Sequence, residues 1–147
     1  MLSVHWGKGI QCLCQLINRC LILAIRLIDF SAIVIDVVEK LPGTKIGHHI
    51  ASQLLRAGTS PAPNHAEAKS AESRKDFIHK MKVGLKELRE TQVWLRVIKR
   101  KNIITSAEVV DVALAESNEL LAIFASSIAT ARRNMENPKK ELVNGQQ

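Results

Sequence analysis

The sequence is poor in aromatic and turn-forming residues. Aromatic residues make up 3% of its 147 residues, tyrosine is absent, and there are seven glycines and four prolines. All-β folds depend on alternating β-branched and aromatic residues with frequent turns, so this composition argues against them. The scarcity of aromatic rings also argues against domains that stack nucleic-acid bases on exposed rings.

The sequence also lacks the motifs of the common enzyme classes. It contains no glycine-rich phosphate loop, no GxSxG and no HExxH. His48 and His49 are adjacent and therefore diverge on a helix, while His65 lies beside two prolines. We therefore predict that the chain is not an enzyme and that it uses no cofactor.

Three cysteines, Cys12, Cys14 and Cys20, lie near the N-terminus. An odd number of cysteines without a spaced framework predicts reduced thiols in a cytoplasmic protein. Zinc binding by these thiols and His5 is disfavoured, because Cys12 and Cys14 would point about 200° apart on a helix and no CxxC pair exists. We predict no metal site.

A long hydrophobic run is also missing. Residues 10–28 are rich in leucine, isoleucine and cysteine, but Arg19, Arg26 and several amides interrupt them. A membrane-spanning helix needs about 20 predominantly apolar residues, and arginine near its centre is costly. The segment is therefore predicted as a soluble helix without a membrane partner, and a peripheral membrane role is the weaker alternative.

What the sequence does have is helical periodicity, in a chain that is 46% hydrophobic and 24% charged. Apolar residues recur at steps of three and four in four segments. These segments lie near residues 12–41, 45–71, 73–101 and 106–134. Pro42 and Gly43 end the first, while Gly58, Pro61 and Pro63 are expected to split the second. The pattern predicts an all-α, antiparallel up-and-down four-helix bundle.

Each segment has a candidate core face. In the first, one seam comprises Leu13, Ile17, Cys20, Ala24, Leu27, Ser31, Val34, Val38 and Leu41, widened by Leu21, Ile28 and Ile35. The second contributes Ile46, Ile50, Gln53, Leu54 and Ala57; the third Phe77, Met81, Gly84, Leu88, Thr91, Leu95 and Ile98; the fourth Val109, Val110, Ala113, Leu114, Leu120, Leu121, Phe124, Ile128 and Ala131. Further apolar residues of the first helix, Ile22, Ile33 and Val37, predict a homo-oligomer interface. We assign residues 26–134 to the bundle, 135–147 to a disordered tail and 1–25 to an extension whose place in the fold the sequence leaves open.

The positive charge is concentrated in one segment. Residues 69–101 hold eleven basic and four acidic residues, which is the whole excess of the chain's net charge of +7. A basic stripe runs opposite the predicted core face of the third helix, with His79 and Val93 within it. Its basic members are Lys75, Lys82, Lys86, Arg89, Arg96 and Arg100. Such a line matches the phosphates of a nucleic-acid backbone. A solvated face, neutralised in part by the acidic fourth helix, is the competing interpretation.

Several short motifs point to a family. They are Ser52–Ser60 (SQLLRAGTS), Asp76–Lys80 (DFIHK), Leu85–Thr91 (LKELRET) and Trp94–Leu95. Across residues 26–134 the chain resembles the bacterial four-helix-bundle proteins encoded in 23S ribosomal RNA intervening sequences. It is also similar to the accessory variability protein of diversity-generating retroelements. The chain departs from the pattern at Pro61 and Pro63, where the family usually has one proline or none, and at His65, which replaces an apolar residue.

The resemblance implies a cytoplasmic bundle that assembles into a five-fold ring. The retroelement relative implies nucleic acid and a reverse transcriptase as partners, and the family supplies no catalytic residues to carry over. From this resemblance and the basic stripe together, we expect a non-enzymatic, oligomeric binding or assembly protein that contacts the backbone of RNA or DNA. The alternative is a scaffold that docks an acidic protein partner and has no nucleic-acid role.

Overall fold

The helices of the protein are seen in a computed structural model, which describes residues 8–136 and places side chains from residue 19 onward. The helices are α1 (Lys8–Glu39), α2 (Lys45–Thr59), α3 (Pro61–Lys69), α4 (Arg74–Lys101) and α5 (Ala107–Glu136). No strand occurs between residues 8 and 136, so the predicted all-helical fold is confirmed. The predicted tail beyond residue 136 and the side chains of His5, Cys12 and Cys14 lie outside this description.

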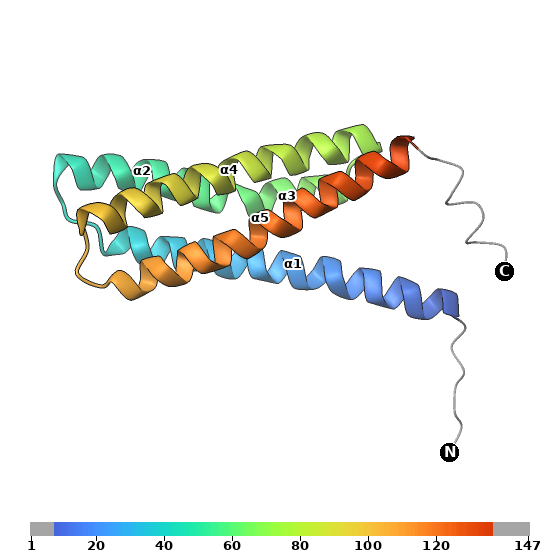
Figure 1. Ribbon diagram of the computed structural model, residues 1–147, viewed down its shortest axis with the longest axis horizontal. Coiled ribbons are helices and arrows are strands. Elements are labelled where there is room, and N and C mark those ends of the chain that lie inside the picture. The colour runs from blue at the N-terminus through green and yellow to red at the C-terminus, as the bar shows by residue number, and fades with distance from the viewer. Residues whose placement is uncertain (1–7, 137–147) are drawn as a thin grey trace, which may run out of the picture.

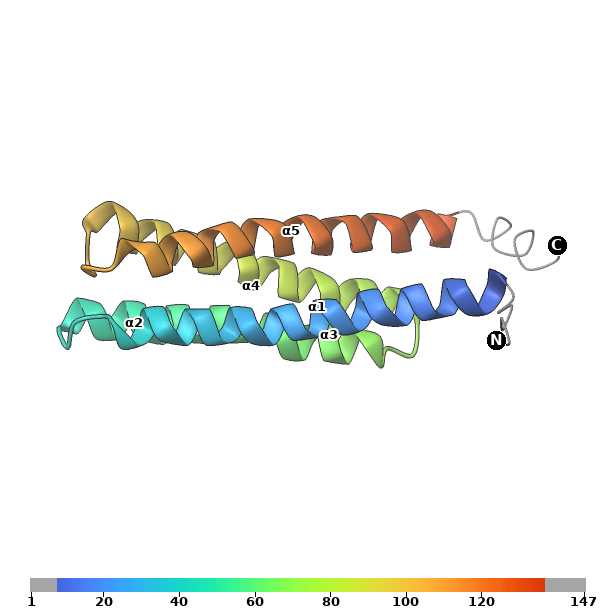
Figure 2. The same ribbon diagram turned by 90° about the horizontal axis from the view of Figure 1, so that it is seen from below.

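The helices form four long rods, with α2 and α3 in succession along one of them (Figures 1 and 2). In Figure 1, α1 runs toward the left end, α2 and α3 return to the right, α4 runs left and α5 returns. The first rod is a single helix from Lys8, so residues 8–25 continue without a break into the segment predicted to begin the bundle. Toward its N-terminal end α1 diverges from α5, which leaves that end of the molecule more open (Figure 1).

The second rod breaks at Ser60, as Gly58, Pro61 and Pro63 predicted. Helix α2 ends at Thr59 and α3 begins at Pro61, where the missing proline N–H costs no hydrogen bond. Ser60 keeps helical angles (φ −68°, ψ −33°), and the Asn64 side-chain amide donates to its carbonyl oxygen over 2.9 Å. The chain therefore bends at this point without leaving the rod.

Side-chain caps fix where two helices begin. The Thr44 hydroxyl accepts a hydrogen bond from the Gly47 amide over 3.1 Å, and the Ser73 hydroxyl accepts one from the Asp76 amide over 3.1 Å. Threonine and serine at these positions satisfy the free amides of a first helical turn. Helix α4 ends at Asn102 in the left-handed conformation, with φ 48°.

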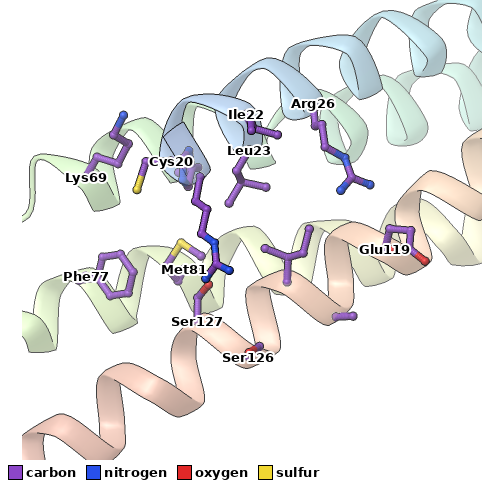
Figure 3. A pocket seen from close by; sticks show the side chains of 14 residues that line it. Cys20, Ile22, Leu23, Arg26, Lys69, Phe77, Met81, Glu119, Ser126 and Ser127 are labelled. Atoms are coloured by element: carbon purple, nitrogen blue, oxygen red, sulfur yellow. The ribbon is translucent and has the colours of Figure 1, made fainter. Parts of the chain in front are cut away.

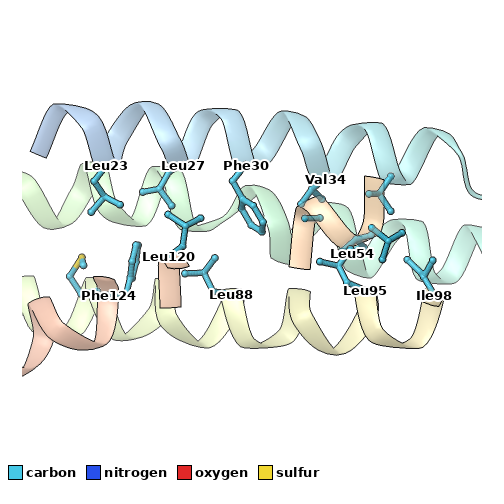
Figure 4. Close-up of a cluster of buried hydrophobic side chains, with 14 of the residues drawn as sticks. Leu23, Leu27, Phe30, Val34, Leu54, Leu88, Leu95, Ile98, Leu120 and Phe124 are labelled. Carbon is cyan, nitrogen blue, oxygen red and sulfur yellow. The ribbon is translucent and has the colours of Figure 1, made fainter. Parts of the chain in front are cut away.

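The core of α4 and α5 lies where periodicity predicts. Met81, Leu88, Leu95 and Ile98 of α4 are at most 1% exposed, and Leu120 and Phe124 of α5 are fully buried. Figure 4 shows these side chains meeting those of α1 and α2 along the bundle axis. Phe77 and Val109 are only partly buried, and Ile46 of α2 is exposed, contrary to expectation.

The predicted core seam of α1 is right for Leu27 and Val34, which are at most 1% exposed, and wrong along its edges. The buried seam is Leu23, Leu27, Phe30, Val34 and Val37. Leu21, Ile28 and Ile35, which were expected to widen the core, are 53%, 63% and 40% exposed, and Cys20 is exposed as well. Val37, expected on the outside, is fully buried and Ile33 is partly buried, whereas Ile22 is exposed as expected. Apolar residues on several faces made α1 ambiguous, because only its neighbours decide which face is buried.

The crossing of α1 and α2 depends on Gly58. A Cβ atom at this position would lie 2.5 Å from Cγ1 and 2.8 Å from Cγ2 of Val34, a buried β-branched side chain. By contrast, a Cβ atom at Gly43 would meet no atom within 4 Å. The two glycines therefore form a matched pair for a test of packing.

We expect Gly58→Ala to lower the free energy of unfolding by about 1–2 kcal/mol, measured by urea denaturation. Overpacking costs about 1–3 kcal/mol, of which the better helix propensity of alanine offsets up to about 1 kcal/mol. Gly43→Ala should change stability by less than about 0.5 kcal/mol. Adding Val34→Ala should reduce the effect of Gly58→Ala; an unchanged effect would contradict the proposed close approach.

Candidate nucleic-acid interface

The basic stripe lies on the exposed face of α4. Lys75, Lys82, Lys86, Arg89, Arg96 and Arg100 are all exposed, as are His79 and Val93 between them. The buried residues of α4, among them Met81, Leu88 and Leu95, point the opposite way, into the bundle. Over the 25 residue-to-residue steps from Lys75 to Arg100 the helix rises about 38 Å, at about 1.5 Å per step. The stripe is therefore a straight line of cations along nearly the whole helix.

Two acidic residues of α4, Glu87 and Glu90, are engaged away from the stripe. Arg56 of α2 reaches across to Glu87 of α4 over 3.1 Å and also pairs with Glu90. Two basic residues of α4 that lie outside the stripe also have acidic partners. Lys99 pairs with Asp111 of α5 and Lys80 with Glu67 of α3, each over 2.5 Å; the latter hydrogen bond raises the pKa of Lys80.

The six basic residues of the stripe have no such partners. Within residues 19–136, none of them makes an ion pair or a side-chain hydrogen bond. The acidic character of α5 therefore neutralises Lys99 and, through Glu116, Arg26 of α1, but leaves the stripe uncompensated. This arrangement favours an anionic ligand over a face neutralised within the chain.

Part of the stripe forms one wall of a groove between α4 and α5. The groove has a volume of about 470 Å³ and is lined by Lys82, Leu85, Lys86 and Arg89 of α4 and by Ala125, Ile128, Ala129 and Arg132 of α5. Four of these side chains are cationic and none is acidic. The floor is apolar. An anion in this groove would meet positive charge from both helices.

Arg132 is the basic residue that sequence reasoning missed. It lies 43 positions from Arg89, in a segment whose preceding charged residues are all acidic. The sequence contains one signal for its position: Arg132 follows Ile128, a predicted core residue, by one helical turn and therefore lies on the same side of the helix. That signal becomes useful only when the register of α5 against α4 is known.

A buried polar contact fixes that register. The Gln92 side-chain amide donates to the Ser117 hydroxyl oxygen over 3.0 Å and to the Asn118 carbonyl oxygen over 2.6 Å. The Ser117 hydroxyl in turn donates to the carbonyl oxygen of Leu114 over 2.8 Å. Gln92 is 7% exposed, so a slip of α5 would leave its buried side-chain amide without these two acceptors, whereas the Ser117 hydroxyl would keep its bond within α5.

The remaining sequence expectations concern metals and membranes. Among residues whose side chains are described, no three His, Cys, Asp or Glu residues are grouped so as to hold a metal ion. Within the same part of the chain, α5 is one helix long and apolar enough to span a membrane by length and composition. Two of its large apolar side chains, Leu120 and Phe124, are buried in the bundle, whereas Met135 is 46% exposed.

Comparison with known proteins adds the following findings. A family model described as 23S rRNA-intervening sequence protein matches residues 21–126. A crystal structure of a protein with unknown function from the S23 ribosomal protein family of Bacteroides thetaiotaomicron has a similar fold, with a TM-score of 0.68. The two sequences are 30% identical, and the similarity covers 75% of this chain and 97% of that chain. No curated protein matches this sequence.

The role of Arg56 can be tested through stability. We expect Arg56→Met to lower the free energy of unfolding by about 1 kcal/mol, because the Glu87 carboxylate would lose its partner. The Glu87 side chain is only 12% exposed, while the Arg56 side chain is 54% exposed, which weakens the pair. Adding Glu87→Gln should restore most of the loss.

The matched control is Lys99→Met, which breaks a pair whose side chains are 52% and 51% exposed. Its expected cost is below about 0.5 kcal/mol. If urea denaturation shows that Arg56→Met and Lys99→Met lower the free energy of unfolding equally, then the contact between Arg56 and Glu87 stabilises the fold no more than an exposed ion pair does.

Proposed function

Because the chain belongs to the family of 23S rRNA-intervening sequence proteins, we propose that it acts in the cytoplasm as an oligomeric, non-enzymatic binding protein that contacts the backbone of RNA or DNA. In this proposal the chain is an antiparallel up-and-down four-helix bundle whose α4 carries the binding surface. The observation that supports it best is the stripe of six exposed basic residues without acidic partners in the described chain.

The chemistry of the stripe suits phosphates rather than bases. Lysine and arginine bound to phosphate oxygens fix the position of a nucleic acid without reading its sequence. None of the residues that line the groove is aromatic, so the groove itself offers no ring for base stacking. Binding should therefore discriminate weakly among sequences and depend strongly on salt, because each phosphate contact releases condensed counterions.

A protein scaffold is the second candidate function, and the groove's apolar floor favours it. Leu85 is partly buried and Ile128 is buried, and both lie between cationic side chains of α4 and α5. An acidic amphipathic helix of a partner protein would bring apolar side chains to this floor and carboxylates to its rim. This alternative requires no affinity for nucleic acid, and that difference separates the two proposals.

Oligomer formation is proposed from the outer face of α1. Leu21, Ile25, Ile28 and Ile35 are between 40% and 63% exposed, and with Ala32 they recur at steps of four and three. An exposed apolar seam with this spacing is the pattern by which helices of separate chains pack together. We propose that it contacts a second copy of the chain; the five-fold ring comes from the family resemblance.

The nucleic-acid proposal predicts a specific salt dependence. Titration with duplex DNA and structured RNA at several salt concentrations should give an association constant that falls as salt rises, with a log–log slope of about 0.9 per phosphate neutralised on duplex DNA. Reversing the charge of Lys82, Lys86 and Arg89 together should weaken binding to every nucleic acid about equally, since the contacts are to the backbone.

Two neighbouring arginines provide a matched control. Arg132 lines the groove, whereas Arg133 lies outside it and contacts the Thr130 hydroxyl oxygen over 3.3 Å. Arg132→Gln should lower the salt slope by about 0.9, and Arg133→Gln should leave it nearly unchanged. Absence of binding at low salt, or an unchanged triple variant, would refute the proposal and favour the scaffold.

The oligomer proposal predicts a change in mass. Light scattering at micromolar concentration should give a multiple of the chain mass, and Ile25→Lys with Ile28→Lys should shift it toward the monomer, because buried lysines lack partners at such an interface. Ile46→Lys is the control, since Ile46 is 68% exposed but belongs to α2. A wild-type monomer would refute the proposal.

A further inference from the structure

A second cavity shares no lining residue with the basic groove. It has a volume of about 590 Å³ and lies where α1, α3, α4 and α5 come together (Figure 3). This size falls within the range of small-molecule sites, about 300–1,000 Å³. Leu23 from α1, Phe77 and Met81 from α4 and Ile123 from α5 supply its apolar wall.

His65 is the unusual residue of this cavity. Its side chain is 4% exposed and packs at 6.3 Å from the Phe124 ring. His65 makes no hydrogen bond with any described residue. In the same part of the chain, every fully buried side-chain nitrogen or oxygen atom has a hydrogen-bond partner. The ring nitrogens of His65 must therefore reach open space, and His65 lines this cavity and a smaller hollow of about 270 Å³ between α1 and α3.

The charges around the cavity are mostly positive. Arg19 and Arg26 come from α1, Lys69 from α3 and Glu119 from α5, while α4 contributes only the uncharged Phe77 and Met81. The Arg26 guanidinium is held by Glu116 over 2.8 and 2.9 Å, and this hydrogen bonding raises the pKa of Arg26. Arg19 and Lys69 make no ion pair with residues 19–136.

Lys69 and His65 lie close enough to interact. Burial lowers the pKa of His65, and the charge of Lys69 lowers it further. The cavity therefore combines a neutral imidazole without a partner, an available ammonium group beside it and an apolar wall. An uncharged apolar ligand would leave the imidazole unsatisfied, and a cation would be repelled by Lys69 and Arg19.

We propose that this cavity binds a small amphipathic carboxylate, whose apolar chain lies against Leu23, Met81 and Ile123 and whose carboxylate contacts His65 and Lys69. The imidazole N–H and the ammonium group donate hydrogen bonds to the carboxylate oxygens, and Arg19 adds positive charge at the entrance. This site is independent of the basic groove and does not require the chain to bind nucleic acid.

The test is calorimetric titration of the full chain with octanoate, decanoate and dodecanoate. Each buried methylene should strengthen binding by about fourfold until the chain fills the cavity. Decyltrimethylammonium, which has a comparable chain with the opposite charge, should bind at least about tenfold more weakly than decanoate. Equal binding of the two amphiphiles, or no binding of any alkanoate, would overturn the proposal.

Variants distinguish binding of decanoate in the cavity from its unspecific adsorption to the protein. Ala122 lines the cavity, and Ala122→Phe should weaken decanoate binding at least about tenfold by filling it. Ala129→Phe, seven residues further along α5 and outside the cavity, should have no such effect. Lys69→Gln should weaken binding about tenfold, and Lys40→Gln should not.

The position of the carboxylate has its own readout in the titration of His65, followed by NMR. A carboxylate beside the ring favours the imidazolium, so bound decanoate should raise the pKa of His65. Decyltrimethylammonium should not raise it. Binding of decanoate without any change in the His65 titration would overturn the assigned carboxylate position.

Discussion

The buried hydrogen bond between Gln92 of α4 and Ser117 of α5 sets the register on which the basic groove depends. Apolar side chains along these helices would pack acceptably after a slip of one turn, about 5.4 Å, but the Gln92 amide would then be buried without its acceptors. With the register fixed, Arg132 faces Lys82, Lys86 and Arg89 across an apolar floor. A contact within the core therefore determines a feature of the surface.

Charge is divided between the faces of α4. Glu87 and Glu90 of this helix are drawn toward Arg56 of α2, and Asp111 of α5 is paired with Lys99. Exposed ion pairs contribute little to stability. Their arrangement nevertheless has a consequence for binding, because the carboxylates that could have neutralised the stripe lie elsewhere. The positive charge of α4 is therefore concentrated on one exposed face of the bundle.

Helix α1 has two different roles. Its inner seam, from Leu23 to Val37, packs into the core, while its outer face presents Leu21, Ile25 and Ile28 to solvent. Because α1 also diverges from α5 at its N-terminal end, the bundle is not closed there and the cavity around His65 forms (Figures 1 and 3). A histidine is tolerated at this buried position because its ring nitrogens reach the open space of the cavity.

The sequence by itself determined the helices, the break at Ser60, the caps at Thr44 and Ser73, and the exposed face of α4, because each follows from local spacing and backbone chemistry. It could not determine which face of α1 is buried, since apolar residues cover several faces and burial depends on what packs against them. The place of Arg132 beside the stripe and the cavity around His65 were also decided only by the tertiary structure. Both depend on which helices are neighbours and in what register, and residues far apart in the chain carry no local pattern that specifies this.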